Sequence, residues 1–187
     1  MSNTGALSHV RVLDLSRILA GPWATQCLAD LGADIVKVER PGAGDDTRSW
    51  GPPYLDDNSS RSAYFCSVNR NKRSLALDIS SEEGALILRK IARESQVVVE
   101  NFKQGSLTRY GLDYESLRVE NPSLVYCSIT GFGQSGPEAA RAGYDFMIQG
   151  MAGLMSVTGE PEGMPVKVGV ALSDVLTGLN AAVASAV

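Results

Sequence analysis

Ser173 and Asp174 stand at the start of a final apolar segment with helical character, and their types could do chemistry there. Serine and aspartate are common helix N-caps, and a cap alone would explain both residues. A carboxylate at a helix N-terminus is also expected to stay ionised, because the helix dipole favours its negative charge. An ionised carboxylate can act as a nucleophile. Residue type alone therefore favours a helix-capping role for Ser173 and Asp174, with a nucleophilic role for Asp174 as the alternative.

A second candidate is the run Gly131–Gly136, GFGQSG, which fits the G-x-G-x-x-G pattern of dinucleotide-binding loops. The run follows the fifth predicted strand rather than the first, and the segment after it is short and broken by Gly143. No strand that ends in an acidic residue follows at the expected distance. We therefore interpret the run as a glycine-rich connection and expect no nicotinamide cofactor.

Several basic side chains lie close to the ends of predicted strands. In a parallel sheet the carboxyl ends of the strands meet at one edge, where ligands bind. Cations gathered there could hold phosphate groups. The alternative is solvated surface charge, and spacing does not decide between the two. The residues concerned are Arg40, Lys72, Arg73, Lys103 and Arg109.

Histidine and cysteine usage argues against other kinds of site. His9 is the only histidine, and the 3 cysteines have no C-x-x-C spacing. A zinc site and a Ser-His-Asp triad are therefore not expected, and we predict no metal. General acid–base chemistry would fall to carboxylates, lysines or tyrosines. Cys27 and Cys127 lie in apolar stretches and are interpreted as buried free thiols.

The elements that must position these residues alternate between strand and helix. This alternation predicts an α/β fold with a doubly wound, mostly parallel sheet and flanking helices. Asp14 and Ser16, after the first strand, are interpreted as a turn and helix entry. A long polar loop is expected over 41–63. Strands are predicted at 10–15, 34–40, 74–79, 97–101 and 124–130, with helices at 21–33, 82–95 and from 171 onward and short helical segments between.

The composition suits a soluble globular protein, with 187 residues, 44% of them hydrophobic and 20% charged. A net charge of -4 argues against general nucleic-acid binding. No apolar run reaches the roughly 18 residues of a membrane span, and no signal peptide is apparent, so we predict a cytoplasmic protein without a membrane partner. The final apolar helix has no stop signal, which predicts a fragment of a longer chain.

Taken together, a series of segments resembles the family III CoA-transferases, the group that contains formyl-CoA transferase and carnitine CoA-transferase. The resemblance runs from about residue 8 to the end of the chain. It implies a Rossmann-like large domain, with residues 1–187 as its N-terminal part and with the small domain and the C-terminal return segment absent. The segments are VLDLSRILAGP (12–22), LGADIVKVERPGAGDDTR (31–48), NRNKRSLALD (69–78), VVVENF (97–102), YCSITGFGQSGP (126–137), AGYDFMIQGMAGLMSVTG (142–159) and VGVALSDVLTG (168–178).

The resemblance implies an enzyme that moves CoA from an acyl-CoA to a carboxylic acid through a covalent aspartyl-CoA intermediate. Asp174 matches the family nucleophile, which reverses the preference for a cap. Acyl-CoA and a small carboxylate would be the substrates, with no permanently bound cofactor, and the full-length chain would form an interlocked homodimer. The positions that match the CoA site are Leu19, Ala20, Arg40, Leu77, Asn101, Phe102, Arg109, Tyr144 and Asp145.

Departures from the family pattern bear on the substrate and on two alternatives. Formyl-CoA transferases carry glutamine where this chain has Leu19, which argues against a formyl/oxalate pair. The segments GPPYL, YCSITGFGQSGP and RAGYD most resemble members that act on dicarboxylic acids such as succinate, glutarate or malate, with Arg17 or Arg48 as candidates for the extra cation. The α-methylacyl-CoA racemases have histidine at the position of Tyr144, so a racemase-type isomerase would lack its base here. A non-catalytic CoA-binding fragment is the other alternative.

Overall fold

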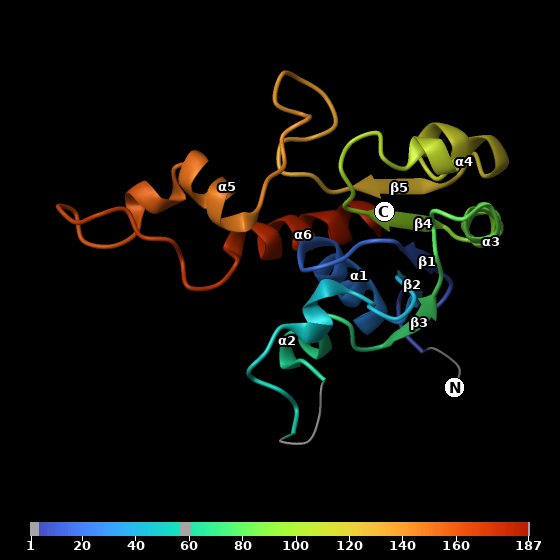
Figure 1. Cartoon of the computed structure of the whole chain (residues 1–187), viewed down its shortest axis with the longest axis horizontal. Coiled ribbons are helices and arrows are strands. Elements are labelled where there is room, and N and C mark those ends of the chain that lie inside the picture. The colour runs from blue at the N-terminus through green and yellow to red at the C-terminus, as the bar shows by residue number, and fades with distance from the viewer. Residues whose placement is uncertain (1–3, 57–60, 187) are drawn as a thin grey trace.

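The computed structural model describes residues 4–56 and 61–186, and its centre is a five-stranded parallel sheet (Figure 1). The strand order is β3-β2-β1-β4-β5, so the chain builds outward on one side of β1 and then crosses to the other. This confirms the predicted α/β class and the doubly wound sheet. The strands are β1 (Arg11–Asp14), β2 (Asp34–Glu39), β3 (Lys72–Ala76), β4 (Val97–Glu100) and β5 (Val125–Ser128).

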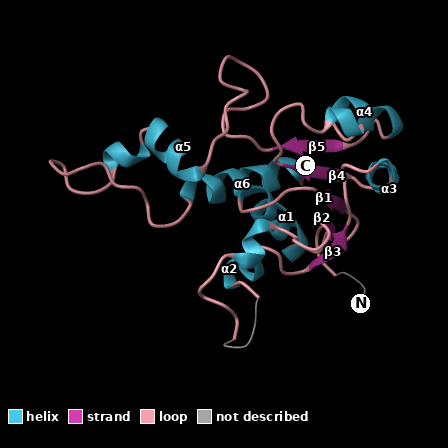
Figure 2. Ribbon diagram, viewed as in Figure 1, coloured by secondary structure: helices cyan, strands magenta, loops and turns pink. Residues whose placement is uncertain are grey.

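Helices cover both faces of the sheet (Figure 2). On one face α1 (Ala20–Asp30) and α6 (Leu172–Ser185) pack against the side chains of Val12, Ile35 and Val97. On the other face α3 (Glu82–Arg93) and α4 (Tyr114–Glu120) pack against Leu13 and Val98. Because successive side chains of a strand point to opposite faces, the alternating apolar residues of these strands supply two separate cores.

The third strand begins two residues earlier than the sequence predicted. Residues 72–76 pair with β2, whereas the apolar side chains of Leu77 and Ile79 leave the sheet and pack against the core under α3 and α4. An edge strand pairs with one neighbour only, so its polar residues stay partly exposed and periodicity locates its ends poorly.

Short helices occupy the connections. The predicted loop 41–63 contains η1 (Asp46–Ser49) and leads into α2 (Ala63–Ser67); part of that loop, residues 57–60, lies outside the described residues. Elsewhere lie η2 (Thr108–Tyr110), α5 (Asp145–Met151) and η3 (Leu154–Val157). The α5 and η3 segment extends away from the sheet (Figure 1). No helix follows the glycine-rich run directly, which agrees with its interpretation as a connection.

A glycine sets the contact between α1 and α6. A Cβ atom on Gly178 would lie 2.6 Å from the carbonyl oxygen of Ala20 and 3.1 Å from the Cβ atom of Trp23. Only glycine lets the two backbones approach so closely. The contact brings the second turn of α6 beside the first turn of α1.

Within the described ranges, no helix is both long and apolar enough to span a bilayer, and no group of three or more His, Cys, Asp or Glu residues could hold a metal ion. The 3 cysteines are free and partly buried. Burial raises the pKa of the Cys27 and Cys127 thiols, which keeps both protonated.

Candidate active site

A cavity of about 300 Å³ lies at the carboxyl edge of the sheet, between the segments that follow β1 and β4. The strand order reverses between these two neighbouring strands, and such a switch point is where α/β sheets bind ligands. The segments 17–20, 101–104 and 129–131, which follow β1, β4 and β5, form part of the lining. The rest of the lining comes from Asp46, Ala139, residues 141–144, Ile148 and the first two turns of α6, which contribute Ser173, Asp174 and Thr177.

Asp174 lines this cavity and does not cap its own helix. The N-cap of α6 is Ala171, and no side chain at that position accepts a hydrogen bond. The backbone N–H groups of Ser173 and Asp174 instead donate to Oδ1 of Asp145, at 2.7 Å and 3.3 Å. The cap interpretation of Ser173 and Asp174 is therefore wrong, because a carboxylate from α5 caps the helix. The carboxylate of Asp174 is left to face the cavity.

The surroundings raise the pKa of Asp174 to about 6. Partial burial is the larger cause, because it disfavours the charged form, and the negative charge of Asp145 is the second. Desolvation and the neighbouring carboxylate outweigh the favourable effect of the helix dipole, although the group is still ionised at neutral pH. Above pH 6 the group is ionised, poorly solvated and more basic than a surface aspartate, which suits a nucleophile.

Most residues predicted for the CoA site meet around this cavity. Leu19, Ala20, Asn101, Phe102 and Tyr144 line it together with the predicted nucleophile. Their sequence positions span more than 120 residues, and the parallel sheet brings them to one edge. The side-chain amide of Asn101 makes two hydrogen bonds to the backbone of Arg17, so its contact with a ligand would be additional to a structural role.

Four further predicted contacts lie outside the cavity lining: Asp145, which caps α6, and Arg40, Arg109 and Leu77. Arg40 forms an ion pair with Asp46, which is itself a lining residue, so its guanidinium is close to the rim. The guanidinium of Arg109 stacks 4.6 Å above the ring of Tyr110. Leu77 packs against the core under α3 and α4. For these residues a contact with CoA stays a prediction.

Lys72 and Arg73, which were predicted to join a group of ligand-binding cations, do not line this cavity. Arg73 pairs with Asp34, the first residue of β2, at 2.7 Å. Lys72 is buried and donates to Oδ2 of Asp14 at 3.2 Å. Lys72 and Arg73 are the first two residues of β3, so their backbones lie at the amino end of the sheet. Burial lowers the pKa of Lys72 to about 8.

Tyr144 stands in the cavity where a racemase would have histidine, and its side chain is 70% exposed. The sole histidine of the chain, His9, precedes β1 and so lies at the opposite edge of the sheet. Neither residue supplies an imidazole base next to Asp174. Sequence reasoning missed other lining residues, Asp46, Arg141 and Thr177, because no motif marks them.

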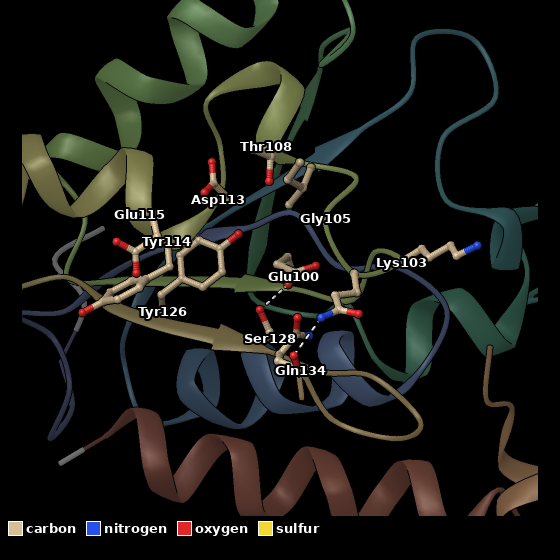
Figure 3. Close-up of a pocket in the computed structure, with 12 residues that line it drawn as sticks. Glu100, Lys103, Gly105, Thr108, Asp113, Tyr114, Glu115, Tyr126, Ser128 and Gln134 are labelled. Atoms are coloured by element: carbon tan, nitrogen blue, oxygen red, sulfur yellow. Dashed lines mark hydrogen bonds between the residues drawn. The ribbon is translucent and has the colours of Figure 1, made fainter. Parts of the chain in front are cut away.

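A second cavity of about 530 Å³ lies beside the first, between the segment after β4 and the start of α4 (Figure 3). Two of its lining residues are joined by a hydrogen bond, which the side-chain amide of Gln104 donates to the carbonyl oxygen of Gln134. Its lining carries the carboxylates of Glu100, Asp113 and Glu115 and one cation, Lys103. Burial raises the pKa of Glu100. This acidic lining is a poor match for the phosphates of CoA.

Comparison with known proteins decides the family. The model of the family described as CoA-transferase family III matches residues 7–187. The chain belongs to CoA-transferase family III. The resemblance drawn from the sequence segments is thus confirmed.

Relatives within CoA-transferase family III are similar to this chain over most of its length. The succinate–glutarate CoA-transferase of Agrobacterium fabrum is 57% identical over 176 residues, which cover 92% of this chain and 44% of that protein. The human succinyl-CoA:glutarate CoA-transferase is 50% identical over 181 residues, covering 97% and 41%. The crystal structure of a CAIB/BAIF family protein from Brucella suis superposes with a TM-score of 0.93 and 56% identity, covering 97% and 48%. The chain therefore spans less than half the length of these relatives.

Proposed function

We propose that the protein transfers CoA from an acyl-CoA to a carboxylic acid, with Asp174 as the covalent nucleophile. The observation that carries the proposal is a partly buried carboxylate with a pKa of about 6 in a cavity at the switch point of the sheet. The names of the relatives that are 57% and 50% identical support the reaction class. Residues 1–187 would be the N-terminal part of the large CoA-binding domain of a cytoplasmic enzyme.

The reaction divides into steps whose atoms and charges balance. The carboxylate of Asp174 attacks the thioester carbonyl, and the C–S bond breaks to give a mixed anhydride and the CoA thiolate. The thiolate attacks the aspartyl carbonyl of the anhydride, which releases the donor acid as its carboxylate and leaves an aspartyl-CoA thioester. The acceptor carboxylate then attacks this thioester, and the released thiolate attacks the acceptor acyl carbonyl. New acyl-CoA leaves, and the Asp174 carboxylate is restored.

The acids exchanged are proposed to be dicarboxylates such as succinate and glutarate. A second carboxylate needs a cation near the acyl pocket, and of the two arginines considered, Arg48 is already engaged. Its guanidinium donates two hydrogen bonds to Glu39, at 2.6 Å and 2.8 Å, and stacks on the ring of Phe65. Arg17 lines the cavity, where it contacts Asp46 at a longer distance of 3.3 Å and its guanidinium lies 5.7 Å from the ring centroid of Phe102, another lining residue. Arg17 is thus the better candidate.

The full-length enzyme is proposed to act as an interlocked homodimer, with acyl-CoA and the acid as its substrates and no permanently bound cofactor. Asn101, Phe102 and Tyr144 would contact bound CoA within the cavity, and Leu19 and Ala20 would border the thioester. Arg40, Leu77 and Arg109 would contact its nucleotide end beyond the rim. These contacts are supported by the position of the cavity and by the family relationship.

A trapping experiment on the full-length protein tests the covalent step. The protein is incubated with succinyl-CoA, glutaryl-CoA or acetyl-CoA, quenched with hydroxylamine, and digested for mass spectrometry. We expect a donor-dependent hydroxamate at Asp174 that Asp174→Ala abolishes and Asp113→Ala, in the other cavity, retains. An adduct at another residue, or exchange of the donor α-proton without any adduct, would refute the proposal.

The proposed role of Arg17 has its own test. Replacing it by methionine should lower kcat/KM for succinyl-CoA by about tenfold to a hundredfold, because a hydrogen bond to a charged group is worth about 1.5–3 kcal/mol. The value for acetyl-CoA should change much less, since that donor has no second carboxylate. An equal loss for both donors would assign Arg17 to CoA rather than to the dicarboxylate.

A further inference from the structure

A buried ion pair holds the segment that leads from β1 into the cavity. Lys37 of β2 and Asp45 lie 2.9 Å apart, with side chains that are 2% and 1% exposed. The ammonium group of Lys37 also donates to the carbonyl oxygen of Ser16 at 2.9 Å. The carboxylate of Asp45 accepts the N–H of Ile18 at 3.2 Å. The pair thus forms hydrogen bonds with the backbone on both sides of Arg17.

The remaining backbone groups of this segment are also bound by side chains. Asn101 accepts the N–H of Arg17 at 2.9 Å and donates to its carbonyl oxygen at 2.7 Å. Asp14 accepts the N–H of Ser16 at 2.9 Å. Every polar backbone group from the Ser16 N–H to the Ile18 N–H therefore has a side-chain partner. Connections usually satisfy such groups with water, so this segment is held more firmly than its position in a loop requires.

What the segment holds is an unfavourable conformation. Ile18 has φ of 71°, a region that a β-branched residue rarely enters because its side chain crowds the backbone. Such a conformation persists only when the surrounding structure enforces it. Leu19 and Ala20 follow directly, and they line the cavity that contains Asp174. The direction in which the chain enters the cavity is therefore fixed at Ile18.

The burial of the pair is informative in itself. Removing two charges from water costs several kcal/mol per ion, and well-packed apolar residues can often replace such a pair at no loss of stability. Asp45 also accepts hydrogen bonds from the N–H and hydroxyl groups of Thr47, which fix η1 and with it the lining residue Asp46. The pair thus connects two of the loops that form the cavity.

We propose that Lys37 and Asp45 are positioning residues for CoA transfer, which hold Ile18 in its strained conformation and so set Leu19 and Ala20 against Asp174. The proposal rests on the proposed function for its kinetic consequence. It names residues that contact no reacting atom, and it assigns their effect to the geometry of the 16–20 segment. Loss of either partner should therefore lower kcat more than it raises KM for the acyl-CoA.

The first test replaces Lys37 by methionine in the full-length protein. We expect kcat to fall by about a hundredfold with little change in KM, because a displacement of about 1 Å at a reacting centre costs that much. The exposed Lys90 of α3 gives the matched control, and Lys90→Met should retain both constants. An unchanged kcat in Lys37→Met would overturn the proposal. Should that variant fail to fold, Asp45→Asn, which keeps the volume of the side chain, replaces it with the same expected result.

The second test asks whether the pair acts through Ile18. Glycine enters positive φ without steric cost, so Ile18→Gly should not need the pair. We expect Ile18→Gly to restore kcat of Lys37→Met by about tenfold, the order of strain that a left-handed residue carries. A purely structural role would give no such rescue. A double variant that folds and is as slow as Lys37→Met would refute the proposed route.

Hydrogen exchange keeps this inference separate from the proposed function. The amide of Ile18 should exchange at least about tenfold faster in Lys37→Met than in the wild type, and at the wild-type rate in Lys90→Met. If the wild-type protein transfers no CoA, the proposed function fails, but this measurement still shows whether Lys37 and Asp45 hold the 16–20 segment. Unchanged exchange at Ile18 would show that the pair does not hold the segment, whatever the activity.

Discussion

Asp145 provides the sharpest test of how the structure sets the reactivity of Asp174. Asparagine at position 145 keeps an oxygen to accept the N–H groups of Ser173 and Asp174 but loses the negative charge. The pKa of Asp174 is raised from 3.8 to about 6, with burial as the larger cause and Asp145 as the second. Asp145 therefore supplies less than half of the rise. Asp145→Asn should lower the pKa of Asp174 to no less than about 5, a change of at most roughly 1.4 kcal/mol.

The assay is the pH profile of kcat/KM for CoA transfer. In the proposed mechanism only the ionised carboxylate of Asp174 attacks, so the wild-type rate should fall as the pH drops through about 6. In Asp145→Asn this acidic limb should move to lower pH by up to about one unit. Asp34→Asn is the matched control, because Asp34 lies at the amino end of β2 and pairs with Arg73 away from the cavity.

Two results would refute the reasoning. An acidic limb at the same pH in Asp145→Asn as in the wild type would mean that the charge of Asp145 does not affect the pKa of Asp174. A limb that moves to higher pH would mean that the substitution increases the desolvation of Asp174 by more than the lost charge lowers its pKa. An NMR titration of the Asp174 carboxyl group gives the same comparison without any turnover.

Two further predictions concern stability. The pKa of Asp174 is higher in the folded chain than its ordinary value of 3.8, so its ionisation opposes folding above about pH 6 and has no effect below about pH 4. Asp174→Asn should therefore raise the free energy of unfolding by at most about 3 kcal/mol at pH 7 and leave it unchanged at pH 3. Urea titrations at the two pH values measure this, and a larger gain at pH 3 than at pH 7 would contradict it. Gly178→Ala should cost about 1–3 kcal/mol in a urea titration and reduce CoA transfer, because the added Cβ meets a carbonyl oxygen of α1 at 2.6 Å. Gly169→Ala, where nothing lies within 4 Å, should be close to neutral, and equal losses for both would argue against the helix contact as the cause.

Much of the fold follows from local pattern. The apolar run at β4 and the amphipathic α3 are visible in the sequence, because burial on two faces or on one face imposes different periodicities. Ser81 caps α3 as its type and the following glutamates predict. The short α2 was missed because five residues are too few to show a helical period. The start of β3 was misplaced because an edge strand has no fully apolar pattern.

The site was predicted unevenly, for physical reasons. The sequence segments were sufficient to indicate the family and to select Asp174, which lines the cavity in the structure. Charge close to a strand end was a poor guide: Lys72 begins its strand and is buried against Asp14 instead of facing a ligand. No local sequence pattern distinguishes Lys37 from an exposed lysine in a strand, yet its side chain is fully buried.

The sequence by itself determined the order of strands and helices, the class of fold and the residue that resembles a nucleophile. Only the tertiary structure decided the pKa of Asp174 and the backbone conformation of the segments that line its cavity. Asp145 reaches the helix of Asp174 across a separation of 28 residues, and Asp45 reaches Ile18 across 27. A pKa and a strained backbone depend on burial and on charges a few ångströms away. Those neighbours are brought together by packing, and no chain-local pattern records them.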